Sequence, residues 1–220
     1  SRRLDIETHI RWQGRRTLLR ALLPLEIHSH EAWYETAFGA IARPTHRNTS
    51  WDAARFEVNA HRWADLSEAG YGVSLLNDGK YGHSTHKNVM GLTLLRSPVF
   101  PDPLAEEGTH HFTYSIYPHE GDWRGNTFLE AHDLNAPLQA CIVPASKGTW
   151  NSSQSFVQIS GTGLRFSSLK KAEDSNEIVL RFYEAVGGRG TAKLETGLGI
   201  KKVLNVNFLE EATTKSNSSI

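Results

Sequence analysis

Apolar and polar residues alternate with a period of two along much of the chain, a pattern typical of β-strands with one buried face. In residues 5–12, Ile6, Ile10 and Trp12 fall on one face and polar residues fall on the other. The same alternation recurs in residues 112–117, 178–184 and 202–208. Further strands are predicted at residues 16–23, 32–42, 55–60, 71–76, 81–85, 89–96, 140–144, 155–160, 164–169 and 191–195.

Glycine-rich and Asn-Asp-Gly segments separate the predicted strands. The tripeptide Asn77-Asp78-Gly79 lies between two of the predicted strands. It predicts a tight hairpin turn, because asparagine, aspartate and glycine all adopt the backbone angles that such turns need. Turns of this kind join neighbouring antiparallel strands. The pattern therefore favours antiparallel over parallel sheets.

One helix is predicted, from about residue 122 to residue 134. Asp122 could cap its amino end, and Phe128, Ala131 and Leu134 would face inward. Many strands with at most one or two short helices predict an all-β fold, and the number of strands favours a large antiparallel β-sandwich.

Charge and cysteine content narrow the functional classes. The chain carries 24 Lys+Arg and 24 Asp+Glu, so no net charge attracts it to nucleic acid or to an anionic membrane. No apolar run approaches the roughly 20 residues that span a bilayer. Cys141 is the single cysteine, which excludes an internal disulfide and indicates a reducing, cytoplasmic compartment. Within the apolar residues 140–144, Cys141 is predicted to be inert core.

The chain begins at Ser1 without a methionine or a signal peptide, so we expect a piece cut from a longer protein. Residues 1–209 are predicted to form a single domain. Residues 210–220 are polar and are predicted to be a frayed tail or the start of a further segment.

Eleven histidines raise the possibility of a metal site. Close pairs occur at His28 and His30, at His83 and His86, and at His110 and His111. His28 and His30 could chelate a metal from one face of a strand. No pair has a third ligand at a recurring metal spacing, so we predict no metal site and no cofactor in this chain.

Catalytic motifs are missing from the sequence: it has no Gly-x-Ser-x-Gly elbow and no phosphate-binding loop. Carboxylates that could form an acid/base pair are Asp52, Glu57, Asp65, Glu68 and Asp78, although solvated loop positions are the simpler interpretation. Aromatic residues that could stack on sugar rings are Trp51, Trp63, Tyr71 and Tyr81, with burial in the core as the alternative.

The stretch from Phe38 to Asn88 carries a specific resemblance. The segments that carry it are 38–45 (FGAIARPT), 48–52 (NTSWD), 55–58 (RFEV), 61–68 (HRWADLSE), 71–82 (YGVSLLNDGKYG), 94–98 (LLRSP), 101–103 (PDP), 112–118, 134–138 (LNAPL) and 180–185 (LRFYEA). They resemble the C-terminal region of glycoside hydrolase family 38 α-mannosidases, in particular the cytosolic and vacuolar type. The resemblance covers residues 4–208.

This resemblance implies a galactose mutarotase-like β-supersandwich that lies outside the catalytic barrel. Family members hydrolyse α-mannosides with retention, and their nucleophile and zinc ligands lie in an N-terminal barrel that this chain lacks. We therefore expect no catalytic residue here. The expected partners are the protein's own N-terminal catalytic domain and an α-mannoside or oligosaccharide, and the face that meets the barrel could also support a homo-oligomer.

Loops of this domain are expected at the rim of the active site. The first candidate loop offers Asn77, Asp78, Lys80 and Tyr81, which can bond sugar hydroxyls or contact the barrel. The second candidate is formed by Arg43, Pro44 and Thr45, at the start of a predicted loop over residues 43–51. Two other classes of protein remain open: an independent carbohydrate-binding module, and a mutarotase-like aldose epimerase, which rests on analogy of fold.

Overall fold

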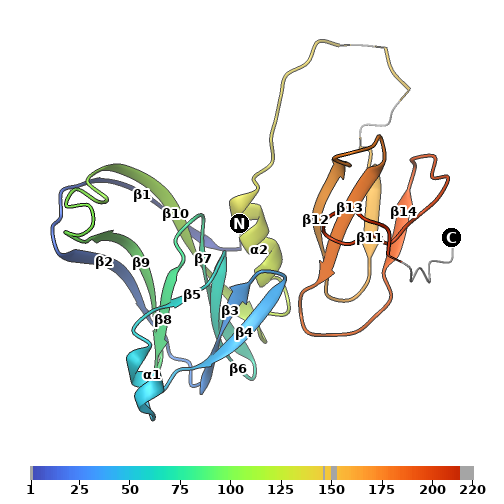
Figure 1. Cartoon of the computed structure of the whole chain (residues 1–220). Helices are drawn as coiled ribbons and strands as arrows, with labels where there is room; N and C mark the ends of the chain where they lie inside the picture. Colours follow the sequence, from blue (N-terminus) through green and yellow to red (C-terminus); the bar gives the residue numbers. More distant parts are fainter. Residues whose placement is uncertain (1, 146, 150–152, 214–220) are drawn as a thin grey trace. The chain divides into compact units, whose positions relative to one another are not determined.

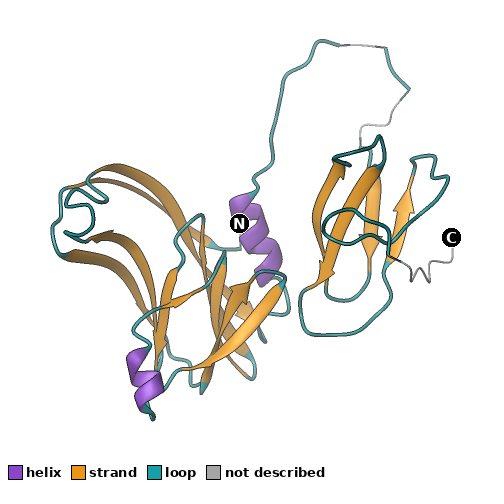
Figure 2. Cartoon of the chain, viewed as in Figure 1, coloured by secondary structure: helices purple, strands orange, loops and turns teal. Residues whose placement is uncertain are grey.

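A computed structural model of the chain describes residues 2–145, 147–149 and 153–213. Its contacts group into two compact units, Ser1–Cys141 and Ile142–Ile220, each with its own strands (Figure 1). Strands are the main element of both units, and helices are few and short (Figure 2). The predicted all-β class is confirmed. The single domain predicted over residues 1–209 remains a prediction.

Two antiparallel sheets form the first unit. The larger sheet has the order β1-β10-β7-β6-β3-β4 and consists of β1 (Leu4–Trp12), β3 (Glu31–Thr36), β4 (Gly39–Pro44), β6 (Trp63–Glu68), β7 (Tyr71–Asn77) and β10 (Gly108–Glu120). The smaller sheet has the order β2-β9-β8-β5 and consists of β2 (Thr17–Pro24), β5 (Val58–Asn59), β8 (Gly82–His86) and β9 (Val89–Ser97). The unit also contains the helices α1 (Ser50–Ala54) and α2 (Thr127–Asn135).

The apolar faces of the two sheets pack against each other as a sandwich. Tyr34, Leu66 and Leu75 come from the six-stranded sheet, Leu92 and Met90 come from the four-stranded sheet, and all five belong to one buried cluster. Burying each aliphatic side chain of this kind stabilises the fold by about 1.5–3 kcal/mol. The alternation in the sequence produces this arrangement, because every second residue of a strand faces the same side.

The predicted strand at residues 32–42 is two strands. β3 ends at Thr36, and β4 begins at Gly39 and pairs with β3 as a hairpin. Phe38 sits in the turn with a positive φ of 65°, a conformation that side chains other than glycine rarely adopt. Sequence reasoning missed this turn because neither Ala37 nor Phe38 is a typical turn residue.

The segment Asn77-Asp78-Gly79 does not form the predicted hairpin turn. It begins at the last residue of β7 in the six-stranded sheet and precedes β8 in the four-stranded sheet, so it carries the chain from one sheet to the other. The Asn77 carboxamide holds this crossing: its Oδ1 accepts hydrogen bonds from the backbone N–H groups of Gly79 (3.0 Å) and Lys80 (2.7 Å). This local turn satisfies the backbone without pairing β7 and β8.

Helix α2 packs on the outer face of the six-stranded sheet, against β6 and β7. Phe128 and Ala131 are buried as predicted, and the Phe128 ring lies edge-on to Trp63 at 5.1 Å. The helix begins at Thr127 rather than near residue 122. Asp122 instead accepts a hydrogen bond from the backbone N–H of Arg124 at 2.9 Å, which holds a turn ahead of the helix.

The described residues of the second unit form two small antiparallel pairs: β11 (Val157–Ser160) with β14 (Lys193–Thr196), and β12 (Leu164–Lys171) with β13 (Ile178–Glu184). The strand predicted at residues 202–208 is reduced to an isolated bridge between Val206 and Ala212. Residues 214–220 of the predicted tail lie outside the described part of the chain. The start of that tail is held in place, since Glu210 accepts a hydrogen bond from Arg181 at 3.0 Å.

The strand predicted at residues 140–144 is wrong. These residues have no regular structure and are exposed, and Ile142 is completely exposed to solvent. Cys141 is exposed as well, so it is not core. An apolar run becomes a strand only where a neighbouring strand satisfies its backbone groups, and residues 140–144 have no such neighbour among the described residues.

Candidate binding site

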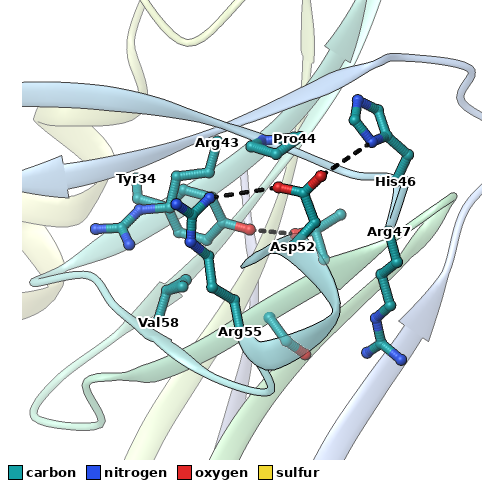
Figure 3. Close-up of a pocket in the computed structure, with 10 residues that line it drawn as sticks. Tyr34, Arg43, Pro44, His46, Arg47, Asp52, Arg55 and Val58 are labelled. Carbon is teal, nitrogen blue, oxygen red and sulfur yellow. Dashed lines mark hydrogen bonds and ion pairs between the residues drawn. The ribbon is translucent and has the colours of Figure 1, made fainter. Parts of the chain in front are cut away.

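A pocket opens in the first unit where β3, β4, α1 and β8 come together (Figure 3). Its lining is Tyr34, Arg43, Pro44, His46, Arg47, Asp52, Arg55, Val58, Ser84 and Thr85. Three of these side chains, those of Arg43, Arg47 and Arg55, carry guanidinium groups, and Asp52 carries a carboxylate. The lining is therefore rich in hydrogen-bond donors, which suit sugar hydroxyls or an anionic group.

Helix α1 positions the carboxylate of this pocket. Thr49 caps the helix: its hydroxyl accepts a hydrogen bond from the Asp52 backbone N–H at 3.1 Å, and the Asp52 carboxylate accepts from the Thr49 backbone N–H at 3.2 Å. Asp52 also lies 3.5 Å from Nη1 of Arg55 and 3.7 Å from Nδ1 of His46. The hydrogen bond from the Thr49 hydroxyl is the main cause that lowers the pKa of Asp52, with smaller contributions from these neighbours.

Arg43, the residue before the last of β4, lies at one wall of the pocket. Its guanidinium carbon lies 5.4 Å from the centre of the Tyr34 ring, and its Nη2 donates a long hydrogen bond of 3.4 Å to Asn59. The Tyr34 hydroxyl donates to Thr85 Oγ1 at 2.9 Å, and burial raises the pKa of Tyr34. Arg43 is half-buried and its Nε–H is buried, so the N–H groups at the end of its guanidinium are the ones that can donate to a ligand.

Asn77 is fully buried and holds the crossing loop, residues 77–81 between β7 and β8, from inside. Its Nδ2 donates to the carbonyl of His61 at 2.9 Å and lies 3.3 Å from Nε2 of His83. An amide that donates to this ring nitrogen requires a neutral imidazole. Burial lowers the pKa of His83 to about 4, partly opposed by a hydrogen bond to the backbone of Lys80, which agrees with that neutral form. Asn77 thus positions the loop and presents no free group to a ligand.

The other three candidates on the crossing loop differ in their availability. Asp78 accepts a hydrogen bond from the backbone N–H of Thr113 at 2.8 Å, which attaches the loop to β10. The Lys80 ammonium lies 4.4 Å from the centre of the Phe112 ring, a cation–π contact. Tyr81 is 58% exposed, so most of its ring is accessible. Tyr81 is the aromatic group of this loop that a ligand can reach.

Arg43 and Tyr81 flank the same short segment, residues 58–61. Arg43 donates to Asn59, the backbone N–H of Ala60 donates to the Tyr81 carbonyl at 3.1 Å, and the Tyr81 ring lies 6.3 Å from that of His61. The two candidate loops are therefore attached to one strand-and-loop segment around β5. Among the candidates, Arg43 lines the pocket, and the residues of the crossing loop do not.

The remaining acidic and aromatic candidates separate by burial. Trp63 is core, whereas Trp51 and Tyr71 are exposed. Glu57, Glu68 and Asp78 are exposed, as the interpretation of solvated carboxylates predicts. Asp65 contradicts that interpretation: it is completely buried, and its Oδ2 lies 2.7 Å from Nε2 of His119. Ser67, on the same strand, also donates to this carboxylate, but Ser74 and His119 lie on β7 and β10, so the strand register was needed to predict these two contacts.

The histidine pairs that are close in sequence are not the ones that the fold brings together with further ligands. Among the described residues, a possible metal-binding group consists of Glu7, His9 and His111, whose donor atoms lie within 4.8 Å of one another. Sequence reasoning missed it because His9 and His111 are on different strands. The pairing register of β1 and β10, which places His9 opposite His111, is the information that was needed to predict this group.

The fold and the pocket place the first unit in the class of antiparallel β-sandwich domains, with a donor-rich pocket that holds one carboxylate. Residues 1–104 match the family model of the glycosyl hydrolases family 38 C-terminal domain, and residues 163–219 match that of the glycosyl hydrolases family 38 C-terminal beta sandwich domain. The chain belongs to glycoside hydrolase family 38, as a C-terminal portion of its α-mannosidases.

Individual relatives agree with this assignment. The chain is 42% identical to alpha-mannosidase G of Dictyostelium discoideum over 99% of its own length and 20% of that protein, and 41% identical to human alpha-mannosidase 2C1 over 92% of its own length and 20% of that protein. A crystal structure of an alpha-mannosidase from Enterococcus faecalis V583 shares the fold, with a TM-score of 0.86 at 19% identity over 97% of this chain and 25% of that one. The chain therefore spans about a fifth of the length of the curated relatives it matches.

In the described part of the chain, no helix is long and apolar enough to cross a membrane.

Proposed function

We propose that this chain is the non-catalytic C-terminal part of a retaining α-mannosidase. It packs against the protein's own N-terminal catalytic domain and forms part of the rim of the active site. The zinc ion of catalysis belongs to that other domain. The substrate is an α-mannoside or oligosaccharide that the whole enzyme degrades in mannose and oligosaccharide catabolism, and the compartment is the cytoplasm. The observation that carries the proposal is the match of both family models to C-terminal domains of this family.

The chemistry of the pocket supports a non-catalytic role. Hydrolysis of a glycoside uses two carboxylates that flank the scissile bond. Asp52 is the carboxylate among the pocket-lining residues, and it is engaged as a helix-capping partner of Thr49. Asp65, the fully buried carboxylate, is hydrogen bonded to Ser74 and His119 within the sheet and lies away from the pocket lining. The pocket lining offers hydrogen-bond donors to a ligand, but it holds one carboxylate rather than the pair that cleavage of a glycoside requires.

Contacts with sugar are assigned to Tyr81 and Arg43. An exposed phenol ring can stack on the C–H face of a pyranose, and a guanidinium group can donate to several hydroxyls. Both residues are attached to the segment at residues 58–61, so they can act on one ligand or on one surface of the catalytic domain. Asn77, Asp78 and Lys80 hold the crossing loop in position.

The first experiment compares this chain with the same chain joined to its native upstream region. Hydrolysis of 4-nitrophenyl α-mannoside is measured for both proteins after removal of tags. We expect turnover from the longer protein and none from the short chain. Turnover by the short chain that persists after repurification would contradict the non-catalytic assignment.

A second experiment tests the rim in the full-length enzyme. Tyr81→Ala and Arg43→Ala should each lower kcat/KM, by roughly 1–3 kcal/mol of transition-state stabilisation for a lost sugar contact. Tyr71→Ala removes another exposed tyrosine as a matched control and should leave kcat/KM unchanged. Unchanged kinetics for both rim variants, at unchanged stability, would remove these residues from the rim.

Titration of the short chain with mannose, monitored by tryptophan fluorescence, tests whether this chain binds sugar by itself. Saturable binding by the chain alone would favour an independent carbohydrate-binding module over a rim that is complete only beside the catalytic domain. We expect no saturation.

A further inference from the structure

A cluster of two histidines and one glutamate lies on the outer face of the six-stranded sheet, at its β1 edge. The imidazole rings of His9 and His111 are stacked with their centres 4.0 Å apart and their planes 16° apart. Glu7 joins them, and the donor atoms of the three side chains all lie within 4.8 Å of one another. All three side chains are exposed, so an ion can reach them directly from solvent.

The strand register brings the three residues together. His9 is directly opposite His111 in the antiparallel pair of β1 and β10, and directly opposite positions have Cβ atoms about 4.5–5.5 Å apart. Glu7 precedes His9 by two positions, so both side chains leave β1 on the same face. The core fixes this register: Ile10 and Phe112 face inward, and a slip of one residue would bury the histidines and expose the apolar side chains.

We propose that Glu7, His9 and His111 bind one Zn²⁺ ion. Two imidazole nitrogens and one carboxylate oxygen are a common ligand set for zinc, with water in the fourth position. Ligand atoms around a tetrahedral zinc ion lie about 3.3 Å apart, given bonds of about 2.0–2.1 Å. Exposed side chains can close from the observed 4.8 Å to that spacing by rotation about their χ angles. This site departs from the expectation, based on sequence spacing, that the chain holds no metal.

The charged residues near Glu7, His9 and His111 and the ligand types themselves determine which cation this cluster binds. Glu7 contributes one negative charge that offsets part of the ion's double charge. Asp5, on the same face, is engaged by Arg3 at 2.7 Å and by Ser115 at 2.7 Å, so it is not a free ligand. Arg11, on the same face two residues beyond His9, repels a cation and weakens binding. The imidazole pair selects zinc over Mg²⁺, which prefers an all-oxygen shell.

A zinc ion at this position would fasten an edge strand. β1 lies at the end of the sheet order, and among the described residues β10 is the one strand with which it pairs. An ion held by Glu7 and His9 from β1 and by His111 from β10 would link the two strands through their side chains. Because the unfolded chain does not hold these ligands together, zinc should bind the folded state preferentially and raise its stability. The site needs no catalytic domain, so it does not depend on the proposed α-mannosidase role.

The test is calorimetric titration of the whole chain, without a histidine tag and after treatment with a chelator, with ZnCl₂. We expect one saturable site per chain and a rise in the melting temperature on addition of zinc. His9→Gln and His111→Gln should each weaken zinc binding at least tenfold, and Glu7→Gln should weaken it less. MgCl₂ should give no saturable binding.

The matched control is the double variant His28→Gln/His30→Gln, which removes two other exposed histidines of the same unit. It should bind zinc as the unaltered chain does. The melting temperature of each variant without zinc shows whether the variant is folded. Absence of a saturable site in the unaltered chain would overturn the proposal. So would zinc affinity that is unchanged in folded His9→Gln and His111→Gln.

Discussion

The Nε2 atom of His119 lies 2.7 Å from Oδ2 of Asp65 on the outer face of the six-stranded sheet. Asp65 is on β6 and His119 is on β10, and Ser74 of the intervening β7 donates to the same carboxylate at 2.7 Å. Thr127, the first residue of α2, contacts the Ser74 hydroxyl at 2.7 Å. This buried network ties three strands and the helix together, and it accounts for a carboxylate with no solvent exposure.

Removal of the Asp65 carboxylate should therefore destabilise the first unit. Asp65→Ala leaves the buried groups of Ser74 and His119 without their acceptor, and each such loss costs about 1–3 kcal/mol. We expect the free energy of unfolding to fall by roughly 3 kcal/mol, measured by urea unfolding followed through tryptophan fluorescence. Asp133→Ala, at an exposed carboxylate of α2, is the control and should change stability little. Equal stability of the two variants would contradict the structural role of the network.

Gly72 lies beside this network and should not tolerate a side chain. A Cβ atom at Gly72 would come within 2.3 Å of the His119 ring and 2.6 Å of the Ser67 hydroxyl. Gly72→Ala should cost about 1–3 kcal/mol, because the displaced groups are packed and hydrogen bonded. At Gly70 a Cβ atom would meet nothing within 4 Å. Thermal unfolding of Gly72→Ala and Gly70→Ala should show a large loss for the first alone, and similar melting temperatures would refute the steric argument.

The buried His83 should make stability depend on pH. Its pKa is about 4 in the folded protein, mainly because of burial, against about 6.5 for an unfolded histidine. Between these values the unfolded chain binds more protons than the folded one, so acidification favours unfolding. The stability associated with neutral His83 is complete above about pH 6.5 and is lost as the pH falls toward about 4, a loss of roughly 3 kcal/mol.

Urea unfolding at a series of pH values, for the unaltered chain and for His83→Gln, would isolate this contribution as the difference between the two curves. NMR titration of the His83 ring in the unaltered chain gives an independent measurement. A titration midpoint at about pH 6.5, the ordinary pKa of histidine, would show that the ring is accessible to protons and that the burial argument is wrong.

Cys141 should react readily in the folded protein. It is the single cysteine of the chain and is exposed, in a segment without regular structure. We expect an aromatic disulfide reagent to label one thiol per chain as completely in native buffer as in urea, because no unfolding is needed for access. Cys141→Ser should abolish the signal. Labelling that requires urea would restore the original prediction of a core cysteine.

Local patterns predicted the strands well where the chain alternates and has a pairing partner. Residues 5–12 and 178–184 became β1 and β13 nearly as expected. The pattern failed at residues 140–144, which are apolar but unpaired, and at the crossing loop, where a hairpin tripeptide joins two sheets. In both cases the missing information was the identity of the neighbouring strand, which period and turn chemistry do not contain.

The candidate site divides in the same way. The sequence predicted Arg43, Asn77, Asp78, Lys80 and Tyr81 as one set of rim or interdomain residues. The fold makes Asn77 a buried anchor, Asp78 a link to β10 and Tyr81 an accessible ring. Residue type determines what hydrogen bonds a side chain can make. Burial determines which of those bonds are already satisfied within the protein.

By itself the sequence determined the all-β class, the inward face of the strands and the glycoside hydrolase family, because these follow from local alternation and from long specific segments. The tertiary structure alone decided the contacts Asp65–His119 and His9–His111. Each joins residues far apart along the chain, and each depends on a strand register set by cooperative packing of the whole core. Register is a property of two strands together, so neither strand's own sequence determines it.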